Sequence, residues 1–228
     1  MSEQLPLKIQ FDEFLTFDNF IIGPNEQAAH YLHNLERDTS QSIYIWGGEG
    51  TGKTHLVQAL YHHLISIGRN PGFVDVSEPE LEPDVLDGFE HFACVVLDGV
   101  ESVIGYADWQ EKLFHLYNRL MANNASIILT SRNNPGSLEA ILPDLSSRLL
   151  SGLVFQLREL SDEDKKVALI KRAGDFGLGI SNEVLNYWMT HCSRDMHEIF
   201  AQLRQLDDAS MAHKRRLTVP FLKQVLGI

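Results

Sequence analysis

The chain has 228 residues, of which 44% are hydrophobic and 22% are charged, as in a globular protein with one large domain or a large and a small one. Its net charge of -12 repels nucleic-acid backbones, so the composition favours protein partners over direct sequence-specific DNA binding. No stretch approaches the roughly 20 apolar residues that span a bilayer, and the N-terminus lacks a signal-peptide pattern, which together predict a cytoplasmic protein without membrane contact.

The first 15 residues are polar and irregular, which predicts a flexible N-terminal arm. The arm contains one apolar group, Leu5-Pro6-Leu7, directly after Gln4. Composition alone favours a disordered arm that happens to hold two leucines.

Short β-rich runs alternate with helical patterns from Ser42 to about Leu157. Several runs are apolar without alternation, as in parallel strands that are buried on both faces. The alternation predicts an α/β fold with a five-stranded parallel sheet flanked by helices, and with the ligand at the carboxyl ends of the strands. The strands are expected at residues 42–46, 72–76, 93–97, 126–130 and 153–157.

A complete Walker A pattern, Gly47 to Thr54, follows the first expected strand and opens a helical pattern. Its glycines let the backbone turn N–H groups around a β-phosphate, to which the following helix presents its positive N-terminal end. Lys53 adds a positive charge, and Thr54 offers a hydroxyl to Mg²⁺. Because the pattern lies between a strand and a helix, it predicts binding of a nucleoside phosphate.

Phosphate chemistry with Mg²⁺ needs a carboxylate at the end of a neighbouring strand, and Asp98 directly follows the apolar run 94–97. In many hydrolysing P-loop enzymes a second acid comes next, but that position here is Gly99. Glu101 lies two residues further on, and the sequence leaves open whether it polarises the attacking water or is an acid of a solvated loop. The pattern therefore predicts slow intrinsic hydrolysis.

Two further candidate site residues lie near the later expected strands. Thr130 ends the buried run 126–130, where its hydroxyl can reach a γ-phosphate or hold the water. Arg148 lies between a turn and the last expected strand, a position that tends to display an arginine outward. A salt bridge at the rim of the protein is the alternative for Arg148.

Strand signals cease after Leu160. Ser161 to Asp164 has the spacing of a capping box, with acids in the first turn of a helix, and helical patterns continue to residue 226. We therefore expect a flexible arm at residues 1–15, an α/β nucleotide-binding domain at 16–159 and a small all-helical domain at 160–228.

The motifs together resemble the AAA+ domain of the bacterial replication initiator DnaA, over essentially the whole chain. In DnaA a DNA-binding helix-turn-helix domain follows the helical lid, whereas this sequence ends at Ile228. A short chain of this kind that begins with Gln4-Leu5-Pro6-Leu7 is most similar to the regulatory inactivators of DnaA. The resemblance is carried by residues 16–25, Gly47 to His55, 147–149, 207–209 and 217–221.

The resemblance implies an AAA+ P-loop NTPase core with a C-terminal helical lid, which binds ADP or ATP with Mg²⁺. Thr54 and Asp98 are the implied metal-binding residues, and Thr130 is the implied sensor 1. The implied nucleotide-binding residues are Ile21, Ile22, Gly23, Gly48, Glu49, Gly50, Thr51, Gly52, Lys53, Thr54, His55 and His197.

The resemblance also implies negative regulation of replication initiation. Arg148 would be an arginine finger aimed at the ATP bound to DnaA, and removal of such an arginine costs about 10³ to 10⁵ in rate in GTPase systems. The arm residues Gln4, Leu5, Pro6 and Leu7 are similar to a peptide that docks on the DNA polymerase sliding clamp. Self-association is left open.

Two positions depart from the DnaA pattern. The lid arginine that senses the nucleotide aligns with His197, and a neutral imidazole cannot replace a permanent cation near a triphosphate. Together with Gly99, this favours a weak ATPase at most, which holds a diphosphate as a structural element; Arg194 could substitute if the lid tilts. A helicase loader or other AAA+ remodeller and a P-loop small-molecule kinase are the alternative interpretations.

Overall fold

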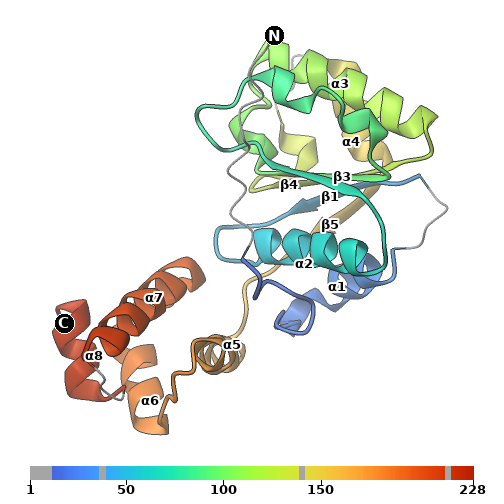
Figure 1. Cartoon of the computed structure of the whole chain (residues 1–228). Coiled ribbons are helices and arrows are strands. Elements are labelled where there is room, and N and C mark those ends of the chain that lie inside the picture. Colours follow the sequence, from blue (N-terminus) through green and yellow to red (C-terminus); the bar gives the residue numbers. More distant parts are fainter. Residues whose placement is uncertain (1–11, 36–39, 139–141, 214–216) are drawn as a thin grey trace.

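The structure, a computed structural model, describes residues 12–35, 40–138, 142–213 and 217–228. Figure 1 shows a sheet with helices on both faces and a separate group of helices beside it. The strands are β1 (Ser42–Trp46), β2 (Pro71–Asp75), β3 (Cys94–Asp98), β4 (Ser126–Ser131) and β5 (Leu153–Gln156). The α-helices are α1 (Glu26–His33), α2 (Lys53–Ser66), α3 (Ala107–Ala122), α4 (Pro143–Ser151), α5 (Asp162–Asp175), α6 (Asn182–His191), α7 (Met196–His213) and α8 (Val219–Leu226).

The five strands form one parallel sheet in the order β2-β3-β4-β1-β5, which confirms the predicted fold class. Strands β1 to β4 are almost entirely buried, as their apolar runs require, whereas β5 lies at an edge and exposes three of its four residues. The register aligns Leu97 with Leu129 and Trp46 with Ser131. The segments that follow β1, β3 and β4 therefore meet at one edge of the sheet, where ligands bind in open α/β sheets.

Helices α1 and α2 cover one face of the sheet, and α3 and α4 cover the other (Figure 1). Each face has its own core because alternate residues of a strand point to opposite sides. Tyr44 packs with α3 and α4, whereas Ile43 and Ile45 pack with α1 and α2. The sequence analysis did not predict α1 or α4, which have only 8 and 9 residues and so show little periodicity.

Helices α5 to α8 pack around a third core, in which Trp188 and Leu203 are fully buried. Helix α5 begins as its capping pattern predicts, because the Ser161 hydroxyl accepts the backbone N–H of Asp164 at 3.1 Å. Within the described residues, no helix combines the length and the apolar character that crossing a membrane requires.

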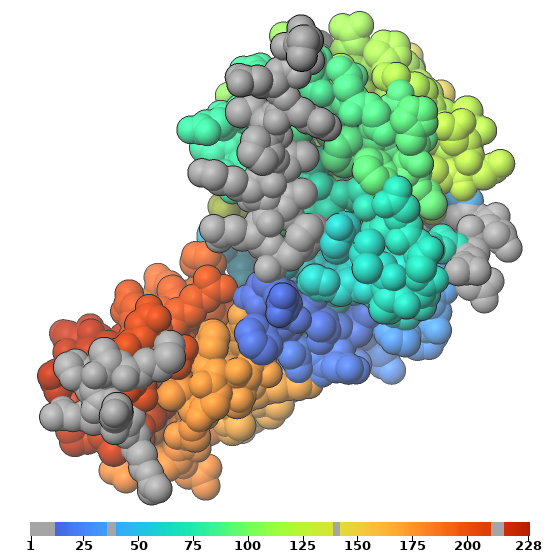
Figure 2. All heavy atoms as spheres, viewed as in Figure 1, coloured from blue at the N-terminus to red at the C-terminus, as the bar shows by residue number. Residues whose placement is uncertain are grey.

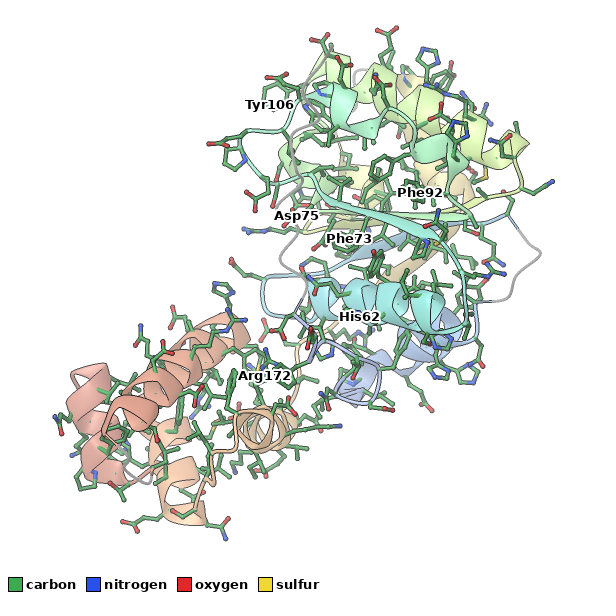
Figure 3. The ribbon with its side chains drawn as sticks, in the orientation of Figure 1. His62, Phe73, Asp75, Phe92, Tyr106 and Arg172 are labelled. Carbon is green, nitrogen blue, oxygen red and sulfur yellow. The ribbon has the colours of Figure 1, made fainter. Side chains whose placement is uncertain are left out.

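A segment without regular structure, residues 12–20, runs between the α/β part and the helical group; we call it the strap. The Asp12 carboxylate accepts hydrogen bonds from Arg172 of α5 and Arg204 of α7, and the Asp12 backbone N–H donates to Gln58 of α2. Figure 3 shows Arg172 at the junction of the two parts, and Figure 2 shows the first described residues, in dark blue, beside the orange part of the helical group.

The strap changes the boundary of the expected arm. Residues 12–15 belong to the folded part, because the Asp12 carboxylate is paired and the Phe14 ring packs edge-on against Phe176. Gln4-Leu5-Pro6-Leu7 lies outside the described residues.

Candidate nucleotide-binding site

The phosphate loop connects the end of β1 to the start of α2. Gly50 and Gly52 have φ angles of +71° and +91°, which residues with a side chain rarely adopt. The Thr51 hydroxyl closes the turn by donating to the backbone oxygen of Gly48 at 2.9 Å. The glycines of the Walker A pattern are therefore needed for the shape of the loop itself.

Lys53 folds back over this loop. Its Nζ donates to the backbone oxygens of Gly47 and Gly48 at 2.8 and 2.7 Å. Burial lowers the pKa of Lys53, while the negative charges of Glu101 and Asp98 oppose that shift. The loop thus holds a cation over its own backbone turn.

Asp98 ends β3 and is only 4% exposed. The Thr54 hydroxyl donates to its Oδ2 at 2.8 Å, and the Thr130 hydroxyl donates to its Oδ1. Thr130 in turn accepts the backbone N–H of Gly99 at 3.0 Å. Burial raises the pKa of Asp98, although the two hydroxyl donors oppose this effect. The fold brings together three side chains that the sequence analysis had selected from separate segments.

The oxygen atoms around Asp98 fit Mg²⁺, which prefers carboxylates, other oxygen ligands and water. Thr54 and Asp98 would hold the ion, and its charge would favour the ionised carboxylate that burial disfavours. When bound, Mg²⁺ neutralises charge on the phosphates.

An arginine to which the sequence analysis gave no role lies beside the phosphate loop. Arg132 Nη1 is 3.5 Å from Glu49 Oε2, and its Nε is 3.3 Å from Glu101 Oε1. The Glu101 side chain is only 18% exposed, and its Oε2 is buried without a hydrogen-bond partner in the described part of the chain. Glu101 is therefore not an acid of a solvated loop. The position of Arg132, two residues after Thr130, is the signal that could have identified it.

The N-terminal end of α7 lies over the phosphate loop. A Cβ added to Gly50 would meet Asp195 Oδ2 at 3.1 Å and the Met196 backbone nitrogen at 3.4 Å. Asp195 caps α7 by accepting the backbone N–H groups of His197 and Glu198. His197, the implied lid residue, has an exposed side chain.

Arg194, the alternative lid cation, pairs with Asp162 at 2.8 Å on the surface of the helical group. Its backbone oxygen accepts a hydrogen bond from Lys165 Nζ at 2.9 Å. Among the described residues, the cations that contact residues of the phosphate loop are instead Lys53 and Arg132.

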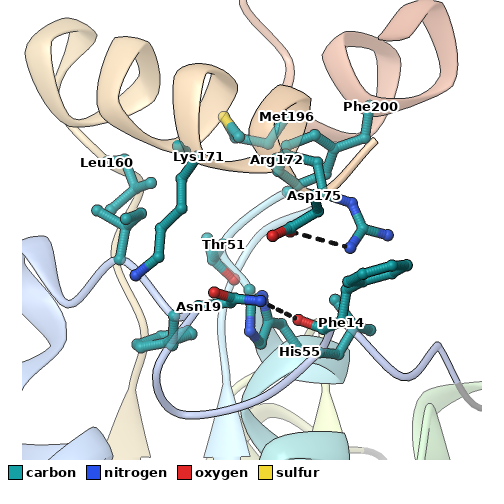
Figure 4. Close-up of a pocket in the computed structure, with 16 residues that line it drawn as sticks. Phe14, Asn19, Thr51, His55, Leu160, Lys171, Arg172, Asp175, Met196 and Phe200 are labelled. Atoms are coloured by element: carbon teal, nitrogen blue, oxygen red, sulfur yellow. Dashed lines mark hydrogen bonds and ion pairs between the residues drawn. The ribbon is translucent and has the colours of Figure 1, made fainter. Parts of the chain in front are cut away.

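A cavity of about 80 Å³ lies between the strap, the phosphate loop and the helical group, as Figure 4 shows. Its walls are mostly apolar, a property that suits a planar base. Of the implied base-pocket residues, Ile21 lines the cavity, while Ile22 is 49% exposed. Gly23 packs so closely that an added Cβ would lie 2.6 Å from Leu160, which also lines the cavity. Four other implied residues line it: Gly50, Thr51, Gly52 and His55.

Arg148 lies in the last turn of α4 and has an exposed side chain. The buried residues Leu145 and Leu149 hold the helix against the sheet, and the Arg148 guanidinium carbon lies 5.7 Å from the centre of the Tyr117 ring. Across the residues that the structure describes, no acidic side chain pairs with Arg148. The alternative of a salt bridge at the rim of the protein therefore has no partner residue in this part of the chain.

Comparison with family models identifies both parts. Residues 11–156 match the bacterial DnaA ATPase domain, and residues 162–226 match the Hda lid domain. The chain belongs to the DnaA-related AAA+ family, as an Hda-like member. An uncharacterized protein from Haemophilus influenzae is 37% identical over 231 residues, covering 100% of both chains.

Solved structures agree with the fold. Domain III of the Thermotoga maritima replication initiation protein DnaA covers 95% of this chain and 97% of its own, with 22% identity and a TM-score of 0.84. AMPPCP-bound DnaA from Aquifex aeolicus covers 90% of this chain and 69% of its own, with 23% identity and a TM-score of 0.69. At such identities the likeness establishes the AAA+ fold alone. The family models make the protein a DnaA-related replication regulator with an AAA+ nucleotide-binding core.

Proposed function

We propose that the protein binds ADP or ATP, with Mg²⁺, between the phosphate loop and the helical group. The position of Lys53, the paired oxygens of Thr54 and Asp98, and the apolar cavity support this proposal. His197 supplies no permanent cation, which favours a diphosphate held as a structural ligand and a weak intrinsic ATPase.

We further propose that the protein is a negative regulator of replication initiation, which stimulates hydrolysis of ATP bound to DnaA. The exposed Arg148 carries this proposal. An arginine supplied in trans stabilises charge on the phosphoryl group in the transition state. Its contact with the Tyr117 ring is worth only about 0.5–1 kcal/mol at an exposed site, so the guanidinium can leave that ring at little cost.

The proposed docking site on the sliding clamp is Gln4-Leu5-Pro6-Leu7. A peptide this short binds with a Kd of about 1 μM, or roughly -8 kcal/mol. Tethering raises the local concentration of the attached body to the order of mM, so a weak peptide suffices. The strap begins five residues after this peptide, so that a docked arm would hold the AAA+ core close to the clamp.

The first test replaces the proposed finger. We expect Arg148→Ala to bind ADP and the clamp as the parent protein does, but to lower stimulated hydrolysis by about 10³-fold or more, because the transition-state charge loses its partner. The measurement is phosphate release from ATP preloaded on DnaA, in the presence of clamp-loaded DNA.

Arg158→Ala is the matched control, since Arg158 is also exposed but makes its hydrogen bonds to Asn25 through its backbone. Normal stimulation by Arg148→Ala would refute the finger. Clamp capture that persists in Gln4→Ala would refute the docking peptide, and no stimulation of DnaA by the parent protein would favour a helicase loader or a kinase.

A further inference from the structure

The phosphate end of the site contains a charged group that the proposed function does not use. Arg132 stands where β4 ends, and its backbone position is fixed because the preceding Ser131 is fully buried and aligns with Trp46 of β1. Its side chain, in contrast, is 59% exposed, so the guanidinium can move without disturbing the sheet.

Two carboxylates from different segments hold this guanidinium at the loop. Glu49 belongs to the phosphate loop and Glu101 follows β3, at 3.5 and 3.3 Å from Arg132 respectively. Arg132 is also close enough to Lys53 for its charge to lower the pKa of that lysine. Through its contact with Glu49, the guanidinium therefore lies at the loop that the Walker A pattern assigns to phosphate binding.

We propose that Arg132 binds the terminal phosphate of a bound nucleoside triphosphate in cis and so distinguishes triphosphate from diphosphate. The inference rests on the nucleotide site proposed above. A guanidinium matches phosphate oxygens through paired N–H donors and stays charged at any relevant pH. With a diphosphate, Arg132 keeps its two carboxylate partners; with a triphosphate, a phosphate oxygen replaces one of them.

In this role Arg132 would provide the permanent positive charge near the phosphates that the helical group does not provide. His197 cannot provide a permanent charge, and Arg194 is engaged with Asp162 on the helical group. Arg132 reaches the same end of the site from the sheet instead of from the lid.

A purely structural role for Arg132 predicts a different result. Its two ion pairs would then fasten the phosphate loop to the segment after β3. Both pairs involve partly exposed side chains, and such a pair typically contributes about 0–1 kcal/mol to stability. A loosened loop would weaken binding of diphosphate and triphosphate alike, because both use the same loop.

The test is a calorimetric titration of the full chain with ADP and with a non-hydrolysable ATP analogue, both with Mg²⁺. We expect Arg132→Ala to bind the analogue about 10-fold more weakly and ADP within about 2-fold, as befits loss of one charge-assisted contact. Arg132→Lys should fall between, because an ammonium keeps the charge without the paired donors. Arg119→Ala, which removes another partly exposed arginine that pairs with Glu90 from helix α3, should bind both nucleotides normally.

Equal weakening of both nucleotides, or unchanged binding of the analogue by Arg132→Ala, would overturn the inference while the proposed site stands. Failure of the parent protein to bind either nucleotide would overturn both. Thermal unfolding of each variant without ligand, compared with the parent protein, tests whether a loss of binding reflects a loss of folding.

Discussion

Asp98 shows how burial prepares a single side chain for a divalent cation. The sheet places it at 4% exposure, where an ionised carboxylate loses most of its solvation. Hydrogen bonds from Thr54 and Thr130 recover part of this loss, yet the pKa stays above its ordinary value. Asp98 therefore destabilises the ligand-free fold, and a bound cation would offset this destabilisation.

The corresponding prediction concerns Asp98→Asn, which keeps an acceptor oxygen and removes the charge. We expect the ligand-free variant to be at least as stable as the parent at pH 7, and its Mg²⁺-dependent affinity for ADP to fall about 10- to 100-fold. Because the folded pKa is raised, the parent should gain stability relative to the variant as the pH falls.

Thermal unfolding with and without Mg²⁺ and ADP, repeated at several pH values, measures both effects. A variant that unfolds more easily without ligand, yet responds normally to Mg²⁺, would contradict this account of Asp98.

At the scale of an element, the strap is the joint between the α/β part and the helical group. Lys171 of α5 donates to the backbone oxygen of Asp18, and the His55 ring bonds the backbone oxygen of Thr16 at 2.9 Å. Burial lowers the pKa of His55, so this α2 contact remains neutral near pH 7. A segment with no helix or strand thus connects three helices through its backbone and through Asp12.

The ion pairs of Asp12 should make the strap sensitive to acid. Burial raises the pKa of Asp12, but the Phe14 backbone N–H and the charges of Arg172 and Arg204 bring it below its ordinary value. A carboxyl group with a lowered folded pKa stabilises the fold above its unfolded pKa, and this contribution is lost as the pH falls through the folded pKa.

We expect Asp12→Asn to lower the free energy of unfolding by about 1–2 kcal/mol at pH 7, since it removes the closer charged partner of the buried Arg172 and leaves it, within the described residues, only Asp175 at 3.6 Å. The loss is smaller than for a fully buried pair because Arg204 is 65% exposed. Urea unfolding of parent and variant should begin to converge as the pH falls below about 4, and the two should coincide only below the lowered folded pKa of Asp12.

Glu13→Gln, which changes an exposed neighbour, is the control and should match the parent throughout. A destabilisation by Asp12→Asn that is independent of pH would show that the Asp12 charge is not what fastens the strap.

At the scale of the whole molecule, each part has its own core and the two meet through few contacts, several of which surround the cavity. At one of these contacts Gly23 has a φ of +45°, and a Cβ added there would lie 2.6 Å from Leu160 Cδ2, so that the leucine side chain would have to move. A ligand in the cavity contacts both parts at once and should therefore stabilise the joint.

A pair of glycine substitutions tests this joint. Gly177 also has a positive φ, +71°, but lies in open space, so Gly177→Ala should cost only about 1–2 kcal/mol of backbone strain. Gly23→Ala adds a collision with Leu160, and we expect it to weaken ADP binding at least about 10-fold while Gly177→Ala does not. Titration with ADP and thermal unfolding separate the two effects; equal ADP affinity in both variants would exclude a role of the joint in binding.

The amino-acid sequence by itself determined those features that depend on neighbours in the chain. Apolar runs gave the strands, the Walker A pattern gave the loop between β1 and α2, and Ser161 marked the start of α5, because hydrogen bonds within a turn or a loop involve residues a few positions apart. Asp98 and Thr130 could also be selected from the sequence, because each lies at the end of an apolar run.

Only the tertiary structure decided which distant residues meet. The order of the strands places Arg132 between Glu49 and Glu101, and the packing of α5 and α7 turns residues 12–15 from an expected arm into part of the strap. Such contacts join segments separated by tens to more than a hundred residues, so the local pattern of residues in the sequence does not predict them. The distribution of charge around the phosphate loop therefore follows from the fold, whereas the loop itself follows from the sequence.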